Sequence, residues 1–217
     1  PMRLRRQAGR KGLKKPQTVA RLNELSRVQL SKSFYMRDFL YSEIAALHGL
    51  PNIPDDPDLA IAAGARLCQD LLEPLQDAFG RLFIRSGLRS AEVNAMGAAK
   101  GYGCASNERS LAGHIWDKRD AAGQMGATAG IVVPSFADAF TAPDDWKRLA
   151  WWIHDHLPYS SVEFFPEQWA FNLQWHEKPL RMIYSHIPEA RGYLTKPGMD
   201  GHDADHRDLW DGIAPHP

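Results

Sequence analysis

The chain has 217 residues, an apolar fraction of 44%, and a formal net charge of zero from 26 basic and 26 acidic side chains. This length and composition exclude a disordered or fibrous chain and fit one domain with a real hydrophobic core. No run of residues approaches the roughly 18 apolar positions that span a bilayer, so we expect no membrane span. The two cysteines, Cys68 and Cys104, are expected to be free thiols of a reducing cytoplasm.

Positive charge is concentrated at the start of the sequence. Residues 1–27 contain nine Lys or Arg residues and one acid, Glu24. Such an arm suits nucleic acid, an anionic cell wall or an acidic protein surface, or it is a solvated tail. The lack of aromatic residues between the charges disfavours nucleic acid. No apolar segment follows the arm, so we expect no secretory signal and a cytoplasmic location as synthesised.

Helical patterns dominate the first third of the chain. After a flexible start, apolar spacing predicts a short helix over 19–30 and a second helix over 37–48, capped by Ser33 or Asp38 and ended by Gly49. A proline-rich loop follows, and Asp58 is expected to cap a long amphipathic helix over 59–79. Pro74 should kink or split that helix, because proline lacks a backbone N–H.

Strand patterns dominate the rest, with one long helix inserted. The sequence predicts an α+β fold, a small and mostly antiparallel sheet flanked by helices. The domain organisation expected is a basic arm with a short helix (1–30), one folded domain (31–187) and a polar, loop-like tail (188–217). The expected elements are a strand over 81–87, a short helix over 88–95, a loop over 97–113, strands over 115–118 and 127–133, a helix over 142–157, and strands over 161–165 and 171–176.

Two stretches contain residues that typically bind metals. His114, Asp117 and Asp120 lie within seven residues, and His176 follows some sixty positions later. If 114–120 is extended, His114 and Asp120 share a face; if it is helical, His114 and Asp117 do. The glycine-rich surroundings favour the extended form, and therefore Asp120. Two imidazoles and one carboxylate leave a position for water on a zinc ion.

Other histidines have simpler interpretations. His154 and His156 are expected at the exposed end of the helix over 142–157. His202 and His206, four residues apart, form either a second metal site or part of a polar tail, and the tail is the simpler interpretation.

Several short motifs in order resemble the zinc D-alanyl-D-alanine carboxypeptidases of the hedgehog/DD-peptidase fold. The resemblance covers about residues 34–176, some two thirds of the chain. The motifs are Ser42-Glu43, Asn52-Ile53-Pro54, Leu71-Leu72-Glu73-Pro74-Leu75 and Ser86-Gly87-Leu88-Arg89-Ser90, with Asn94 following.

The resemblance implies a set of site residues. His114 and His176 correspond to the two metal-binding histidines of that family. The metal-binding Asp corresponds to Asp120, or to Gly130 if Gly126-Ala127-Thr128-Ala129 is aligned with the family's Gly-x-Ala. Arg89 corresponds to the electrophile and carboxylate clamp.

The position of the catalytic base holds Leu173, which does not transfer protons. Glu163, on a neighbouring strand, is the candidate base. The implied function is a zinc-dependent peptidase acting on peptidoglycan stem peptides, delivered to the wall by lysis or as a particle component. The alternative is a catalytically decayed member of the same fold that serves as a binding or structural module, which Leu173 and Gly130 favour.

Overall fold

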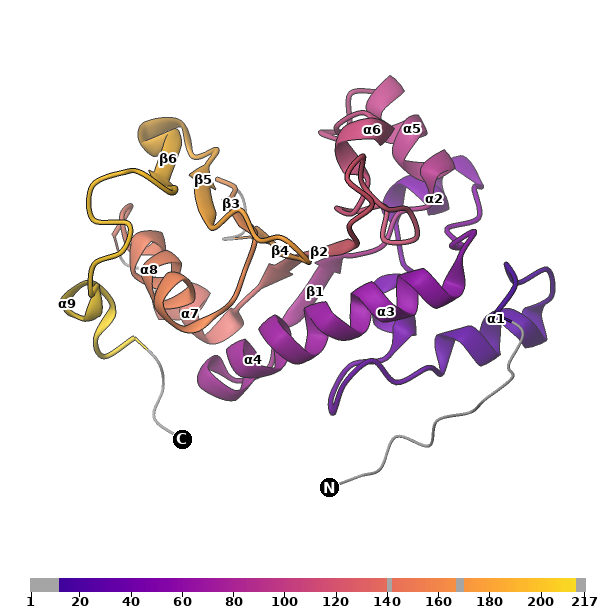
Figure 1. Cartoon of the computed structure of the whole chain (residues 1–217), viewed down its shortest axis with the longest axis horizontal. Helices are drawn as coiled ribbons and strands as arrows, with labels where there is room; N and C mark the ends of the chain where they lie inside the picture. Colours follow the sequence, from indigo (N-terminus) through magenta and orange to yellow (C-terminus); the bar gives the residue numbers. More distant parts are fainter. Residues whose placement is uncertain (1–11, 140–141, 167–169, 214–217) are drawn as a thin grey trace.

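The fold is α+β and is built on one open sheet, as predicted (Figure 1). The computed structural model describes residues 12–139, 142–166 and 170–213. Much of the basic arm, including Arg3, Arg5, Arg6, Arg10 and Lys11, therefore lies outside the described residues. The elements, in chain order, are α1 (Val19–Ser26), η1 (Met36–Phe39), α2 (Glu43–His48), α3 (Pro57–Leu67), η2 (Cys68–Leu72), α4 (Glu73–Phe79), β1 (Phe83–Ser86), α5 (Ala91–Ala99), α6 (Asn107–Ser110), β2 (Gly126–Val132), α7 (Pro134–Ala139), α8 (Trp146–His156), β3 (Ser161–Phe164), β4 (Phe171–His176), β5 (Met182–Ser185), η3 (Pro188–Ala190), β6 (Gly192–Thr195) and α9 (Arg207–Trp210).

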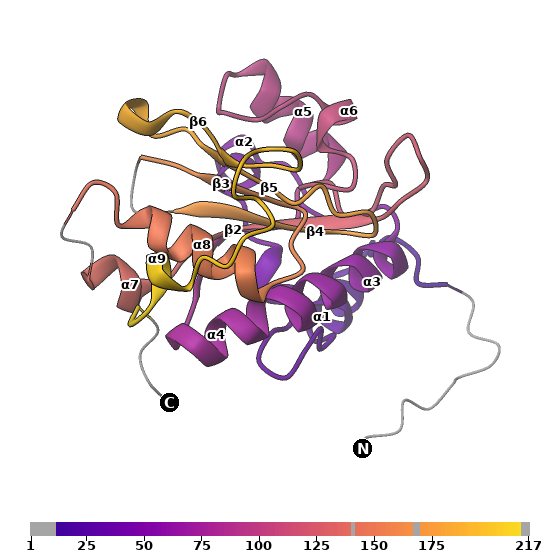
Figure 2. The same cartoon turned by 60° about the vertical axis from the view of Figure 1, so that its left-hand side comes forward.

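The sheet has six strands in the order β1-β2-β4-β3-β5-β6, and only the β3–β5 pair is parallel. Helices α3, α4 and α8 lie on one side of it, whereas α5 and α6 lie toward the other (Figure 2). Strand β4 alternates between buried and half-buried residues. Its buried residues, Phe171, Leu173 and Trp175, belong to the core. The residues between them are polar, so the sheet has one apolar face and one polar face.

A π-helical turn interrupts the long helix expected over 59–79. The turn, η2, ends immediately before α4, whose second residue is Pro74. The N–H of Glu73 bonds to the carbonyl of Cys68, which is the wider spacing of a π-turn. The missing N–H of Pro74 accounts for the irregularity, as predicted. The N-cap, however, is Asp56 and not Asp58, because the Asp56 side chain accepts the N–H of Leu59.

The single helix expected over 37–48 consists of two short helices, η1 and α2. Asp38 accepts the N–H of Tyr35 and organises the 3₁₀ turn η1, whereas Ser42 caps α2 and left-handed Gly49 ends it. The segment between them, residues 40–42, is not helical. The prediction of one helix capped by Ser33 or Asp38 was therefore wrong, although the prediction that the helix ends at Gly49 was correct.

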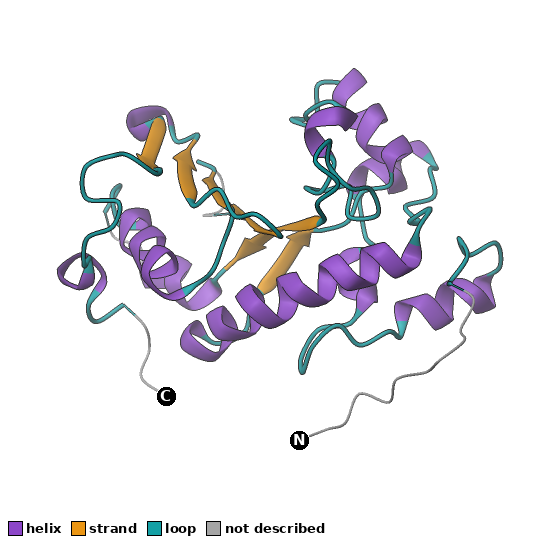
Figure 3. Ribbon diagram, in the orientation of Figure 1, coloured by secondary structure: helices purple, strands orange, loops and turns teal. Residues whose placement is uncertain are grey.

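Two further predictions fail in the second half of the chain. Residues 115–118 form a turn and a bend instead of a strand, with one isolated bridge from Ile115 to Leu111. The segment after Pro188 is not loop-like throughout. Strand β6 pairs with β5, and α9 packs against α8 (Figure 3).

The described cysteines, Cys68 and Cys104, are both free thiols, as expected. Among the helices in the described ranges, none has the length and apolarity needed to cross a membrane.

Candidate functional site

A cavity of about 370 Å³ lies on the polar face of the sheet, which we call the central cavity. Residues of β2, β3 and β4 form its floor, and the chain around α5 and α6 forms a wall. Its lining is mainly polar and charged. The residues are Arg89, Gly103, Ala105, Arg109, Ser110, Gly113, His114, Thr128, Ser161, Glu163, Phe165, Asn172, Gln174 and His186.

Arg89 is held in the cavity wall by buried polar contacts. The side chain of Asn52 donates to the carbonyls of Leu40 and Leu88 (3.0 and 2.7 Å) and accepts the N–H of Ser90 (2.7 Å). These bonds clamp both sides of Arg89. The Asn-x-Pro loop and the Ser-Gly-x-Arg-Ser turn, which are separate motifs in the sequence, are therefore parts of one local structure.

The guanidinium of Arg89 has spare hydrogen-bonding capacity. Its Nη1 donates to Asn94 Oδ1 at 3.0 Å and to Cys104 Sγ at 2.9 Å. Burial lowers the pKa of Arg89 from its ordinary value, although the group is still a cation at neutral pH. Within the described ranges neither Arg89 nor Arg109 pairs with a carboxylate. This wall of the cavity can therefore take an anionic group.

His114 lines the same cavity, but its Nε2 atom is shielded from solvent. Its carbonyl accepts the N–H of Arg89 at 2.8 Å, and its Nδ1 lies 3.0 Å from the carbonyl of Gly87. Because a carbonyl only accepts, Nδ1 carries the proton and Nε2 is left with a lone pair. Nε2 is inaccessible to solvent and has no hydrogen-bond partner among the described residues. Burial, and secondarily the Arg89 cation, lower the pKa of His114 to about 3.

The low pKa of His114 has a consequence for stability. An unfolded histidine binds a proton near pH 6.5, whereas folded His114 remains neutral down to about pH 3, so stability falls as the pH drops below 6.5. Between pH 7 and pH 5 this single group should cost about 2 kcal/mol of unfolding free energy. Between pH 7 and pH 5, the unfolding free energy of the His114→Asn variant should fall by about 2 kcal/mol less than that of the wild type. The measurement is urea unfolding of both proteins at pH 7 and at pH 5. Equal losses in the two proteins would contradict a neutral, buried His114.

The other end of the cavity is acidic. Glu163 Oε2 accepts from Asn172 Nδ2 at 3.1 Å, and Glu163 Oε1 lies 3.8 Å from His186 Nε2. The ring of Phe165 stacks on His186 with a centroid distance of 5.0 Å and an angle of 2°. Glu163, the candidate base of the sequence analysis, therefore lines the cavity. Its immediate partners are an amide and an imidazole.

The structure brings together two of the three predicted metal ligands. His176 Nε2 lies 3.2 Å from Asp120 Oδ2, at the end of β4. Asp120 also accepts the N–H groups of Ala122 and Gln124, and these bonds, the one from Gln124 first, lower its pKa. Neither His176 nor Asp120 lines the central cavity.

His114 does not join this pair. The ligand atoms of His114, Asp120 and His176 do not gather within 4.8 Å of one another. The extended conformation that placed His114 and Asp120 on one face is not present, since residues 114–118 form turns. Asp117, the alternative ligand, points elsewhere: its Oδ2 accepts the N–H of Asp55 at 2.6 Å, and burial raises its pKa.

Gly130 and Asn172 lie directly opposite each other in the sheet and face the cavity side. A Cβ on Gly130 would lie 2.6 Å from Ser86 Oγ and 3.3 Å from Asn172 Oδ1, so this position has no room for a ligand side chain without rearrangement. Leu173, at the predicted base position, is fully buried in the core. In this part of the cavity His114 thus has glycine and an amide as neighbours rather than metal ligands.

Strand alternation in the sequence places Asn172 and Gln174 on the face of His176, and both line the cavity although His176 does not; the sequence analysis names no other residue of this strand as part of the lining. The sequence analysis did not identify Ser161, Arg109 or His186. The alternation in β3, which places Ser161 on the face of Glu163, was a usable signal for Ser161. His186 follows β5, a strand that the sequence analysis did not predict.

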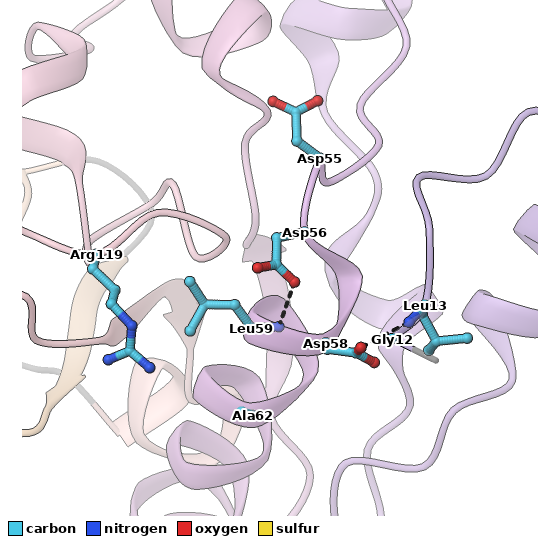
Figure 4. Close-up of a pocket in the computed structure, with 8 residues that line it drawn as sticks. All are labelled: Gly12, Leu13, Asp55, Asp56, Asp58, Leu59, Ala62 and Arg119. Carbon is cyan, nitrogen blue, oxygen red and sulfur yellow. Dashed lines mark hydrogen bonds between the residues drawn. The ribbon is translucent and has the colours of Figure 1, made fainter. Parts of the chain in front are cut away.

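A larger but open groove, of about 650 Å³, lies beside the start of α3 (Figure 4). Its acids already have structural roles. Asp56 caps α3, Asp58 accepts the N–H of Leu13 at 2.7 Å, and Asp55 pairs with Lys15 and Lys118. We therefore place the functional site in the central cavity and not in this groove.

A second cluster of potential ligands lies on the far side of α8. One ligand atom from each of His154, Asp155 and His206 falls within 4.8 Å of the others, so this cluster could hold a metal ion. His154 and His206 are each 5% exposed, and His202 is 7% exposed. The expectation that His154 lies at an exposed end, and that His202 and His206 belong to a polar tail, was wrong. The aromatic residues of α8 and the C-terminal segment bury them.

Comparison of the chain with protein-family models, with curated proteins and with solved structures finds no match.

Proposed function

We propose that the chain is a binding module that holds the carboxylate end of a short peptide in the central cavity. The observation that carries this proposal is that Arg89, a half-buried cation without a carboxylate partner in the described part of the chain, lines the cavity together with Arg109. A guanidinium binds a carboxylate through two parallel hydrogen bonds.

The polarity of the cavity supports the same ligand class. Arg89 and Arg109 are on the wall formed by the α5 and α6 region, whereas Glu163 and His186 are on the strands opposite. A ligand with a carboxylate at one end and hydrogen-bond donors at the other matches this arrangement. The ligands we propose are peptidoglycan stem peptides, the class that the motif resemblance implies, and the fold we propose is the hedgehog/DD-peptidase fold.

Binding without hydrolysis is favoured by the residues around His114. A metal-dependent peptidase needs a metal-bound water and a base that takes its proton. Here His114 lies with Gly130 and Asn172, and Leu173 is buried in the core. The pKa of His114 is too low for it to act as an efficient base at neutral pH.

A zinc-dependent peptidase is the second candidate, and the contact between His176 and Asp120 favours it. An imidazole nitrogen and a carboxylate oxygen 3.2 Å apart are suitable zinc ligands. In this proposal His176 and Asp120 would hold the ion, Arg89 would hold the substrate carboxylate and Glu163 would act as the base.

One experiment separates the two candidates. The probe is an N-acetylated peptide ending in D-alanyl-D-alanine, titrated by calorimetry as the free acid and as the C-terminal amide. We expect the acid to bind and the amide to bind roughly 10- to 150-fold more weakly, because a charged hydrogen bond contributes about 1.5–3 kcal/mol. Equal affinities would contradict the carboxylate clamp.

The same samples are then incubated with added zinc and analysed for free D-alanine. Recovery of intact peptide supports the binding module. Release of D-alanine that requires His176 and Asp120 would overturn it in favour of the peptidase.

A further inference from the structure

The cluster of His154, Asp155 and His206 joins two parts of the chain that are far apart in sequence. His154 and Asp155 are in the last turn of α8, and His206 comes just before α9. The indole of Trp151 stacks on the ring of His206 with a centroid distance of 3.9 Å. Both histidines are 5% exposed. Burial of polar side chains is costly unless each has a polar partner, and the third member of the cluster, Asp155, is exposed to solvent, which gives an ion a route of entry.

The two imidazoles are oriented as metal ligands usually are. His206 Nε2 lies 2.7 Å from the carbonyl of Gly201, and His154 Nδ1 lies 2.6 Å from the hydroxyl of Tyr159. A metal-bound histidine typically uses one ring nitrogen for the metal while a carbonyl or another polar group holds the second. The contacts with Gly201 and Tyr159 provide the bond to the second nitrogen, and each contact fixes the plane of its imidazole ring.

The second nitrogen of each ring is also hydrogen-bonded. His206 Nδ1 lies 2.8 Å from Asp155 Oδ1, and His154 Nε2 lies 2.8 Å from the carbonyl of His202. Two tetrahedral ligands at about 2.0–2.2 Å from one zinc ion lie roughly 3.4 Å apart. An ion between His206 and Asp155 would therefore move these two atoms slightly apart, and coordination through His154 Nε2 would replace its bond to the carbonyl of His202.

We propose that His154, Asp155 and His206 bind one divalent transition-metal ion, which fastens residues 201–213 to α8. Two imidazoles and one carboxylate select zinc, cobalt or nickel over calcium and magnesium, which prefer oxygen ligands. The role is structural, since none of the three residues lines the central cavity. Trp210 Nε1, which donates to Asp155 Oδ2 at 2.6 Å, provides the carboxylate with its outer support.

The test uses the full chain, stripped with a chelator and then given cobalt(II) or zinc(II). We expect one ion per chain by elemental analysis, and for cobalt a visible absorption band typical of a site with nitrogen ligands. Asp155→Asn keeps the size of the side chain and its hydrogen-bond acceptor but removes the charge. It should weaken cobalt binding at least tenfold, and His206→Ala should abolish it.

His48→Ala is the matched control, because it removes an imidazole on α2, where His48 contacts Tyr102, and leaves the cluster of His154, Asp155 and His206 intact. The His48→Ala variant should retain the ion. Loss of the ion in His48→Ala with retention in Asp155→Asn and His206→Ala would overturn the assignment, as would a wild-type chain that binds no cobalt.

A second readout does not depend on whether the variants fold. In the wild-type chain, backbone hydrogen exchange of Ala204, Leu209 and Asp211, whose N–H groups bond within the C-terminal segment, should slow at least tenfold when zinc is added. Unchanged exchange with zinc bound would show that the ion does not fasten this segment, and would overturn that part of the proposal. The peptide titration of the central cavity uses no metal, so failure of one proposal is separable from failure of the other.

Discussion

Arg89→Met should weaken binding of the D-alanyl-D-alanine peptide by roughly 30- to 150-fold, which corresponds to about 2–3 kcal/mol. The methionine keeps much of the length and the apolar stem of arginine but removes the cation. The ligand carboxylate would then enter a half-buried wall without a counter-ion. The measurement is calorimetric titration of the wild type and the variant with the free-acid peptide.

The control for this prediction is Arg85→Met. Arg85 is an exposed arginine on the neighbouring strand β1 and does not line the cavity. The Arg85→Met variant removes one positive charge from the same region but leaves the cavity lining unchanged. Its affinity for the peptide should therefore lie within about twofold of the wild-type affinity. Arg89→Lys provides a further comparison, since a lysine keeps the charge and loses the two-pronged geometry. A wild-type affinity in Arg89→Met would contradict the clamp, whereas an equal loss in Arg85→Met would indicate only long-range attraction.

Gly126→Ala should destabilise the fold by about 3 kcal/mol or more, the largest stability effect that we expect from one methyl group. A Cβ on Gly126 would lie well inside contact distance of the Ala112 carbonyl oxygen, 2.8 Å from His176 Cδ2 and 3.0 Å from the Trp175 carbonyl oxygen. Two of these atoms are backbone, so relief requires movement of β4 or of the turn before His114. For a chain of this size we expect a melting temperature lower by roughly 6–12 °C, measured by calorimetry.

Gly123→Ala is the matched control for crowding. Gly123 lies three residues earlier with a φ of 78°, and a Cβ there would meet no atom within 4 Å. It should cost only about 1 kcal/mol, from the left-handed backbone conformation that side chains disfavour. If the two variants were equally stable, contact with Ala112 would not be the reason for glycine at position 126.

Two hydrogen bonds near Gly126 hold the turn that contains His114. The N–H of Thr128 donates to the carbonyl of Gly113, and Trp116 Nε1 donates to the carbonyl of Thr128. Strand β2 therefore fixes the turn that carries His114, and the close approach at Gly126 is part of that packing. Gly126→Ala should also weaken peptide binding, because a shift of this turn would displace Gly113 and His114, which line the cavity.

Local sequence alone determined the parts of this protein that depend on alternation and on backbone chemistry. The pattern of Phe171–His176 predicted the strand and the face of each side chain, because neighbouring residues in a strand must point in opposite directions. Pro74 predicted the irregular helix, because its missing N–H removes a bond wherever the helix packs. Arg89 and Glu163, which the sequence analysis names as site residues, both line the central cavity.

Only the tertiary structure decided which distant histidines meet. Tertiary contacts hold the turn after His114, since Trp116 donates to the carbonyl of Thr128 and Asp117 accepts the N–H of Asp55. His114 therefore contacts Gly87, whereas Asp120 contacts His176. Likewise, the polar composition of residues 200–208 indicated an exposed tail, whereas Trp151 and the end of α8 bury His206 beside Asp155. Burial of a polar side chain depends on partners some fifty residues away, and local patterns contain no information about such partners.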